Sequence, residues 1–216
     1  MPGLLAKPWY ERPLTHRDLE DLPEDGNRYE VIDGVLYVTP FPNVAHQWVA
    51  TEFVAAIATY LVNHPIGRAF LAGTKVVLDE FSGVGPDLVF IANRNLVGLE
   101  EDGYYGAPDL AVEITSSKPR LDRIVKYQKY AAAGVPEYWI VDPKGHRLQV
   151  YKLARGKYRL AAEHVGGGIF EPTRFPGLRI DMARVWAGSS PPTAAASSPS
   201  GRRAPRSAKP PPRRRR

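Results

Sequence analysis

Residues 109–115 read Asp109-Leu110-Ala111-Val112-Glu113-Ile114-Thr115, an apolar run that opens with Asp109 and is interrupted near its end by a second acidic side chain, Glu113. A short continuous apolar run is typical of a strand in the core of a sheet. An uncompensated charge inside such a strand is costly, so the Glu113 carboxylate must be ion-paired, hydrogen-bonded or bound to a metal. We therefore expect this strand to lie at the centre of the fold and to carry a candidate functional group, Glu113.

Two further carboxylates stand where a core strand normally has none. Glu30 comes just before the turn Asp33-Gly34, and Asp87 follows Gly83-Val84-Gly85-Pro86 and opens an apolar run. Two or three carboxylates that converge from the ends of neighbouring strands are suited to a hard divalent cation such as Mg²⁺. A cation held there would activate water and offset the negative charge that grows on a phosphate. The simpler alternatives are a partnered structural carboxylate for Glu113 and a surface carboxylate of a hairpin for Glu30.

The segment after this strand predicts a helix that brings a lysine to the carboxylates. It begins at Pro119, with Ser117 as its cap, and ends at Gly134, a residue suited to the left-handed conformation that closes helices. Helical spacing places on one face Leu121, Ile124, Val125, Gln128 and Ala132, and on another Asp122, Lys126 and Lys129 or Tyr130. A lysine on the second face would orient or deprotonate the attacking water. The alternative for Asp122 and Lys126 is an ordinary surface ion pair.

The rest of the chain predicts an α/β or α+β domain around a mixed sheet. Asp33-Gly34 between the strand-like stretches 29–32 and 35–38 is a strong hairpin signal. Thr15, with an acid three residues on, marks a helix start. The other predicted elements are a helix over 43–63 and strand-like runs at 69–78, 87–92, 137–142, 147–153 and 157–163. We interpret His46, at the start of that helix, as a cap or packing residue rather than a ligand.

The basic residues are unevenly distributed along the chain. Of 216 residues, 29 are Lys or Arg and 23 are Asp or Glu, but eight of the basic residues and no acidic residue lie in 189–216. The predicted domain, residues 1–188, therefore holds 21 basic against 23 acidic residues, and its composition does not argue for nucleic-acid binding. The tail 189–216 is predicted to be disordered, because it has no large apolar side chain to bury. Its arginines either contact phosphates weakly or keep the protein soluble.

Several classes of protein are excluded by what the sequence lacks. Without cysteine there is no disulfide scaffold, thiolate zinc site, iron–sulfur cluster or cysteine nucleophile. The histidines lack metal-binding spacing, and neither a phosphate-binding glycine loop nor a serine-hydrolase elbow is present. No apolar run reaches the ~20 residues of a membrane span, and no signal peptide is readable. We therefore expect a cytoplasmic protein without a membrane partner.

Five stretches of the sequence together carry a family resemblance. They are Arg28-Tyr29-Glu30-Val31-Ile32-Asp33-Gly34, Gly85-Pro86-Asp87-Leu88-Val89-Phe90, Ala107-Pro108-Asp109-Leu110-Ala111-Val112-Glu113-Ile114, Asp122-x-x-x-Lys126-x-x-x-Tyr130 and Gly134-Val135-Pro136-Glu137-Tyr138-Trp139-Ile140-Val141-Asp142. In order and spacing they resemble the Uma-two family of restriction-endonuclease-like proteins. The resemblance covers residues 14–186, and several motifs in succession make it far more specific than any single one.

The resemblance implies the PD-(D/E)xK nuclease fold, a restriction-endonuclease-like mixed β-sheet flanked by helices. Carried over to this chain, Asp87 would be the first metal ligand and Glu113 the second, with Glu30 as an acid from the amino-terminal part. Mg²⁺, with Mn²⁺ as a substitute, would be the cofactor. The superfamily pattern has a lysine two residues after its second acid, where this chain has Thr115. In this family the lysine is moved to the following helix, which selects Lys126.

The activity implied by the resemblance is that of a Mg²⁺-dependent endonuclease that hydrolyses DNA. The catalytic residues would then be Asp87, Glu113, Lys126 and Glu30. Asp122 would orient the lysine or pair with it, and Lys118 is a weaker substitute for Lys126. Two rival functions stay open: a catalytically idle DNA-binding protein on the same scaffold, and a protein-interaction module with structural carboxylates. Binding of a divalent metal separates the interaction module from the nuclease. The oligomeric state also stays open, with a homodimer common among such folds.

Overall fold

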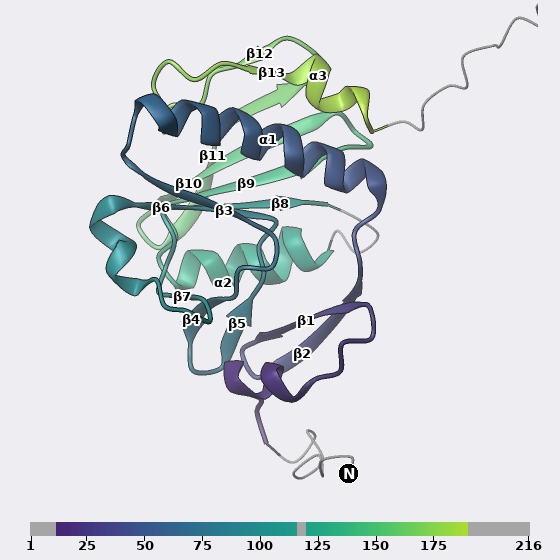
Figure 1. Ribbon diagram of the computed structural model, residues 1–216, viewed down its shortest axis with the longest axis vertical. Coiled ribbons are helices and arrows are strands. Elements are labelled where there is room, and N and C mark those ends of the chain that lie inside the picture. Colours follow the sequence, from purple (N-terminus) through teal and green to yellow (C-terminus); the bar gives the residue numbers. More distant parts are fainter. Residues whose placement is uncertain (1–11, 116–119, 190–216) are drawn as a thin grey trace, which may run out of the picture.

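The computed structural model describes residues 12–115 and 120–189 (Figure 1). The predicted disorder of the tail therefore concerns residues that, apart from Ser189, lie outside the described part of the chain. The same holds for the predicted helix start at Ser117 and Pro119 and for Lys118.

A six-stranded sheet forms the centre of the molecule, with the order β11-β10-β9-β8-β6-β3. The strands are β3 (Gly67–Leu71), β6 (Leu88–Ala92), β8 (Leu110–Ile114), β9 (Glu137–Asp142), β10 (Arg147–Ala154) and β11 (Lys157–Val165). Only the pair β8–β9 is parallel, and the other neighbours in this sheet are antiparallel. The sheet is mixed, as predicted, and the apolar run quoted above is one of its two central strands.

A smaller sheet of five strands, ordered β2-β1-β5-β4-β7, lies beside the first. Its strands are β1 (Asn27–Ile32), β2 (Val35–Pro40), β4 (Val76–Asp79), β5 (Ser82–Val84) and β7 (Tyr104–Tyr105), and the short strands β12 (Ile169–Phe170) and β13 (Ile180–Asp181) pair separately. The helical segments are η1 (His16–Asp21), α1 (Val44–Asn63), η2 (Asn93–Gly98), η3 (Leu121–Lys126), α2 (Tyr127–Ala132) and α3 (Met182–Ala187). Figure 1 shows α1 over one face of the large sheet, and α2 with the small sheet on the other side.

The alternation of side chains along β8 decides which side of the sheet carries the site. Successive side chains of a strand point to opposite faces. Val112 belongs to the apolar core under α1, together with Phe53. Ala111 belongs to the other core, together with Tyr130 of α2. Glu113 shares the parity of Ala111, so its carboxylate is directed toward the helical segment that follows β8 in the chain.

The predicted strand-like run over 69–78 is wrong as a single element. It contains β3 and β4, which belong to different sheets. Gly73, with φ of 105°, lies in the connection, in a backbone conformation that a continuing strand does not have. The sequence also did not indicate β5, β7, η2, β12, β13 and α3, which are too short for a periodic apolar pattern. By contrast, the hairpin at Asp33-Gly34 is confirmed.

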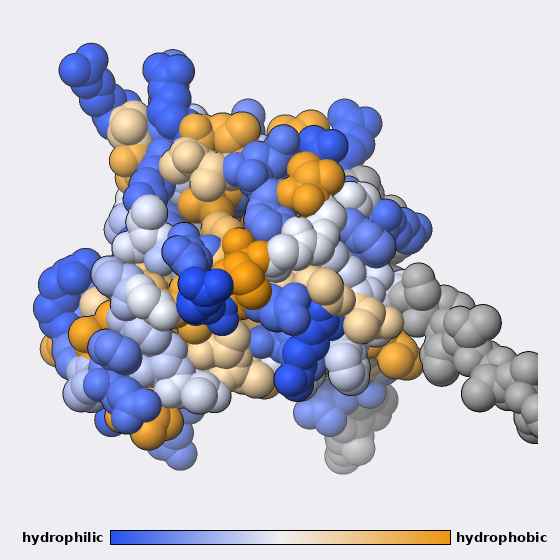
Figure 2. Space-filling view, turned by 90° about the horizontal axis from the view of Figure 1, so that it is seen from above, coloured by the Kyte–Doolittle hydropathy of each residue, from blue (hydrophilic) through white to orange (hydrophobic). Residues whose placement is uncertain are grey.

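The surface gives two further observations. In the ranges 12–115 and 120–189, no helix combines the length and the apolarity that a membrane crossing takes. Figure 2 looks onto the side that carries α1 and α3, and there the apolar residues form several small groups separated by hydrophilic ones.

Two hairpin turns of the same type differ in how closely they are packed. In Asp33-Gly34 the φ angles are 50° and 79°, and in Arg155-Gly156 they are 50° and 73°. Both pairs have the positive φ values of a type I′ turn. A Cβ atom on Gly34 would lie 2.7 Å from the Cβ of Pro13, whereas one on Gly156 would meet nothing within 4 Å.

Replacing Gly34 by Ala is therefore expected to lower the free energy of unfolding more than replacing Gly156 by Ala. Both variants place alanine at positive φ, which costs about 1 kcal/mol. Gly34→Ala adds a clash with Pro13, and overpacking of this kind typically costs ~1–3 kcal/mol. Urea unfolding of both variants beside the wild type measures the difference. Equal losses would show that the segment around Pro13 moves aside freely.

Candidate active site

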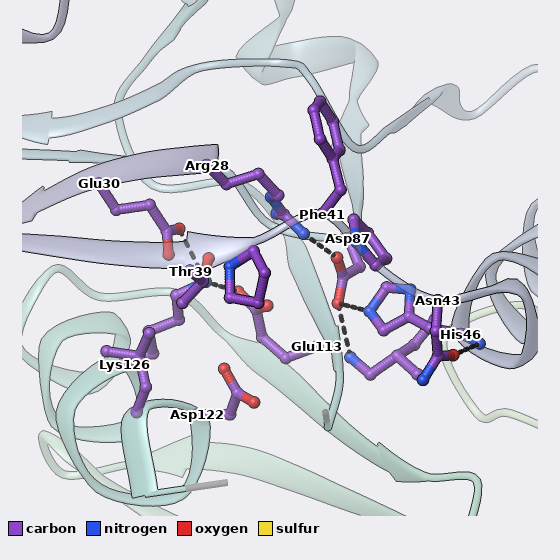
Figure 3. A pocket seen from close by; sticks show the side chains of 14 residues that line it. Arg28, Glu30, Thr39, Phe41, Asn43, His46, Asp87, Glu113, Asp122 and Lys126 are labelled. Atoms are coloured by element: carbon purple, nitrogen blue, oxygen red, sulfur yellow. Dashed lines mark hydrogen bonds and ion pairs between the residues drawn. The ribbon is translucent and has the colours of Figure 1, made fainter. Parts of the chain in front are cut away.

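The candidate site is a cavity of about 250 Å³ where the two sheets, the start of α1 and η3 meet. Its charged and imidazole side chains are Arg28, Glu30, His46, Asp87, Glu113, Asp122 and Lys126. Figure 3 shows these side chains around one space, although they come from segments far apart in the sequence. The structure thus brings together all four residues predicted as catalytic.

The Lys126 ammonium lies between two of the predicted acids. Its Nζ is 2.7 Å from Oε1 of Glu30 and 2.9 Å from Oε1 of Glu113. Tyr130 donates its hydroxyl to the same Glu113 oxygen, at 2.8 Å, and the backbone N–H of Gly85 donates to Oε1 of Glu30, also at 2.8 Å. Only 3% of the Lys126 side chain is exposed. The interpretation of Lys126 as half of a surface ion pair is therefore wrong.

Asp87 is held by three donors from three parts of the chain. Nη1 of Arg28 lies 2.8 Å from Oδ1, while Nε2 of His46 and the backbone N–H of Ile114 lie 2.9 Å and 2.8 Å from Oδ2. The other Arg28 nitrogen donates to the carbonyl of Gly85. Asp87 therefore connects β1, α1 and the end of β8, and both of its oxygens have partners.

The helix after β8 buries its charged face, and of its predicted apolar face only Leu121 is buried. Residues 121–126 are wound as a π-helix before the α-helical turns of α2. Asp122, Lys126, Lys129 and Tyr130 are buried, whereas Ile124, Gln128 and Ala132 are exposed. The reason is that buried carboxylates on the sheets need cations, and the helix supplies them. Lys129 bridges two exposed carboxylates outside the cavity, with Nζ at 2.6 Å from Asp33 and 2.5 Å from Asp79.

The charges in the cavity affect one another strongly. Burial alone would lower the pKa of Lys126, but the surrounding carboxylates, Glu113 first among them, raise it above its ordinary value. Burial would likewise raise the pKa of Asp87, but His46, Arg28 and Lys126 together lower it to about 2. Burial raises the pKa of Glu113 well above its ordinary value, although the Lys126 ammonium opposes this. We conclude that Lys126 is a cation and Asp87 an anion at neutral pH.

Asp122 differs from the other acids of the cavity. Within the part of the chain that the structure describes, its carboxylate has neither a hydrogen bond nor an ion pair, and Figure 3 draws it without one. Burial raises the pKa of Asp122 to about 6. The predicted orienting contact between Asp122 and Lys126 is thus limited to electrostatic attraction.

The side chains of the cavity have a negative net charge, which fits a divalent cation. The acidic side chains Glu30, Asp87, Glu113 and Asp122 outnumber the basic side chains Arg28 and Lys126. Among the described residues no group of three acidic or histidine side chains is arranged to hold an ion. The excess of carboxylates, one of them without a partner among residues 12–115 and 120–189, nevertheless offers a hard cation the type of ligand that it prefers.

Two residues of the site were missed or misread in the sequence. Arg28 stands in the Arg28-Tyr29-Glu30 motif, where only the acid was taken as a candidate. His46 is not the cap of α1, because Asn43 accepts the bond from the His46 backbone N–H. Its ring contacts Asp87 instead. The sequence did offer a signal that the His46 ring is buried. Helical spacing places His46 on the same face of α1 as Val49, Ala50 and Phe53, which are buried.

Comparisons with known proteins place this geometry in context. A model of the Uma2 family, described as "Putative restriction endonuclease", matches residues 16–183. Among solved structures, the chain is similar to a protein of Anabaena variabilis described as a "putative nuclease belonging to DUF820". The two share 20% sequence identity over 82% of this chain and 100% of the other, with a TM-score of 0.65, which shows a common fold.

A weaker similarity is to the type IIG restriction endonuclease BpuSI, with 14% identity and a TM-score of 0.38. It covers 70% of this chain but only 17% of that much longer one. No curated protein matches this chain.

Replacing Asp122 by Asn is expected to stabilise the metal-free protein at pH 7.5. The folded-state pKa of about 6 exceeds the ordinary value of 3.8, so the folded protein retains this proton longer than the unfolded chain does. Stability is therefore lost as pH rises from about 4 through 6, by on the order of 3 kcal/mol. Melting curves in EDTA between pH 4 and 8 should show a smaller loss for Asp122→Asn. The exposed control Asp21→Asn should follow the wild type, and parallel curves for all three would contradict the expectation.

Proposed function

Because this chain belongs to the Uma2 (Uma-two) family, described as "Putative restriction endonuclease", we propose that it is a metal-dependent endonuclease that hydrolyses phosphodiester bonds of DNA in the cavity of Asp87 and Glu113. Membership in this family and the shared fold support nuclease function in general.

The observation that carries the proposal is the position of Lys126. Its ammonium lies in a buried cavity at 2.7 Å and 2.9 Å from two carboxylates, next to a third at Asp87. Unlike Lys129, which bridges two carboxylates outside the cavity, Lys126 lies in a buried cluster with more acids than bases, and such a cluster is unfavourable without a further cation. With that cation bound, the cavity would suit a reaction in which negative charge enters and grows, as it does on a phosphate under attack.

Lys126 would act as a charged donor in this mechanism. Its raised pKa keeps it protonated at neutral pH, which favours orienting the water over deprotonating it. From its place between Glu30 and Glu113 the ammonium would donate to the attacking water or to a phosphate oxygen. In hydrolysis a bond forms from the water oxygen to phosphorus and a bond from phosphorus to a sugar oxygen breaks, while the water loses a proton and the released sugar oxygen gains one. A fixed positive charge stabilises the charge that this transition state places on the phosphate oxygens.

The carboxylates would hold a divalent cation, and we propose Mg²⁺ or Mn²⁺ with Asp87, Glu113 and Glu30 as ligands. When bound, such a cation supplies a Lewis acid that offsets charge on the phosphate. Arg28 and Lys126 balance part of the carboxylate charge before the cation is bound. Tyr130 and the Ile114 backbone N–H fix the directions of the Glu113 and Asp87 carboxylates.

One observation favours the rival reading of a catalytically idle DNA-binding protein. Both oxygens of Asp87 already have partners, in Arg28, His46 and the Ile114 backbone. A carboxylate satisfied in this way has less need of a metal. Metal binding and cleavage are therefore tested separately.

Mg²⁺ or Mn²⁺ is expected to raise the melting temperature of the wild type but not that of the double variant Asp87→Asn, Glu113→Gln. A ligand that binds only the folded state at 100 times its Kd adds about 2.7 kcal/mol of stability, or several degrees for a protein of this size. The matched control Asp21→Asn, Glu24→Gln removes two exposed acids and should respond like the wild type. Equal shifts in all three proteins would place the ion outside the cavity.

Lys126→Met is expected to slow cleavage by roughly 10²–10⁴-fold, the usual range for a lost catalytic donor. The control is Lys129→Met, since Lys129 is also buried and also bridges two carboxylates, but outside the cavity. It should lose stability and keep its rate. The measurement is single-turnover cleavage of plasmid and of single-stranded circular DNA under saturating Mn²⁺.

Equal rates for both lysine variants and the wild type would remove Lys126 from the mechanism. A wild type that binds metal and cleaves neither DNA would favour the idle scaffold.

A further inference from the structure

An exposed aromatic side chain stands at the rim of the cavity. Phe41 lines the same cavity as Asp87, Glu113 and Lys126, yet 66% of its surface is exposed. Figure 3 shows its ring directed away from the carboxylates. A large apolar ring in this position adds little to folding, because burial is what makes such a side chain stabilising.

The backbone around Phe41 is restrained on both sides. Pro40 ends β2 and Pro42 follows directly, so the ring stands between two residues with fixed φ. The position before a proline is itself held in an extended conformation. Asn43 then caps α1, accepting from the backbone N–H of His46 at 2.9 Å. A ring held in place at a surface loses little conformational entropy on binding, which favours contact with a ligand.

The depth of the cavity limits which form of DNA can use it. The side chains of Glu30, Asp87, Glu113 and Lys126 are only 3–4% exposed. A phosphate must therefore enter the cavity to reach them, which a stiff, fully stacked duplex resists and a flexible strand does not. Arg28, with 21% of its side chain exposed, is the cation that an entering phosphate meets nearer the surface.

From these observations we propose that Phe41 stacks on the base of an unpaired nucleotide whose phosphate enters the cavity. The preferred substrate is then DNA with a single-stranded or locally unpaired segment at the cleavage point. This inference rests on the proposed function, because the cavity must receive a phosphodiester. Aromatic stacking on a base tolerates any sequence, since every base presents a π face.

The test measures stacking without cleavage. Single-stranded oligonucleotides carrying 2-aminopurine, whose fluorescence falls on stacking, are titrated into the Glu113→Gln variant in EDTA. The Phe41→Ala, Glu113→Gln variant should bind ~5–150-fold more weakly, corresponding to the usual value of one stacked base, and should lose the quenching. Phe41→Trp in the same background should restore both. Phe81→Ala is the matched control, because Phe81 is also exposed, at 41%, but lies in the β4–β5 turn.

Two results would overturn the inference. One is a Phe41→Ala variant that binds and quenches like its parent, and the other is a fully paired duplex that binds as tightly as the single strand and gives the same quenching. Because the assay needs no hydrolysis, it separates this inference from the proposed function. If the wild type shows stacking but never cleaves DNA, the stacking contact of Phe41 stands and the nuclease proposal is wrong. If Phe41→Ala leaves cleavage unchanged, the nuclease proposal stands and the role of Phe41 is wrong.

Discussion

The ion pairs of Lys126 are the interaction on which the arrangement of the site depends. One ammonium joins Glu30 of β1, Glu113 of β8 and the η3 segment that carries the lysine itself. These groups belong to the small sheet, the large sheet and the helix between them. Burying a single charge is costly, and breaking a buried pair leaves the remaining partner uncompensated. The three elements are therefore held in one relative position by the requirement to neutralise each other's charges.

A second lysine repeats this arrangement one turn further on. Lys129 bridges Asp33, in the β1–β2 turn, and Asp79, at the end of β4. The helical segment thus contacts two hairpins of the small sheet through polar groups, while Tyr130 beside them packs in the apolar core. Lys126 and Lys129 differ in what surrounds them. The first is inside a cavity with buried acids in excess, and the second, although buried itself, has two partners that are largely exposed to solvent.

Much of the fold could be predicted from the sequence, because its long elements have clear periodic patterns. The hairpin at Asp33-Gly34, helix α1 and the apolar strands β6, β8 and β9 all carried such signals. The three acidic candidates were singled out because charges in apolar strands are unusual, and Lys126 was selected by its helical face and by the family resemblance. The partners of Asp87 were not found, since nothing in the local sequence shows that Arg28 and His46 converge on it from 59 and 41 residues away. The charged face of the η3–α2 segment was predicted, but its π-helical turn was not, because such a turn changes the angular spacing that a helical pattern assumes.

The location of Lys126 on a helix rather than on β8 has a consequence for how the protein fluctuates. The sheet strands are joined by backbone ladders, whereas η3 and α2 are attached mainly through side chains. Proteins open in cooperative units whose local free energies are smaller than that of global unfolding. Undocking of this one segment would separate the ammonium from both carboxylates while the sheets stayed intact. The fraction of molecules with a complete site is then set by the docking equilibrium of a single helical segment, independently of the stability of the fold as a whole.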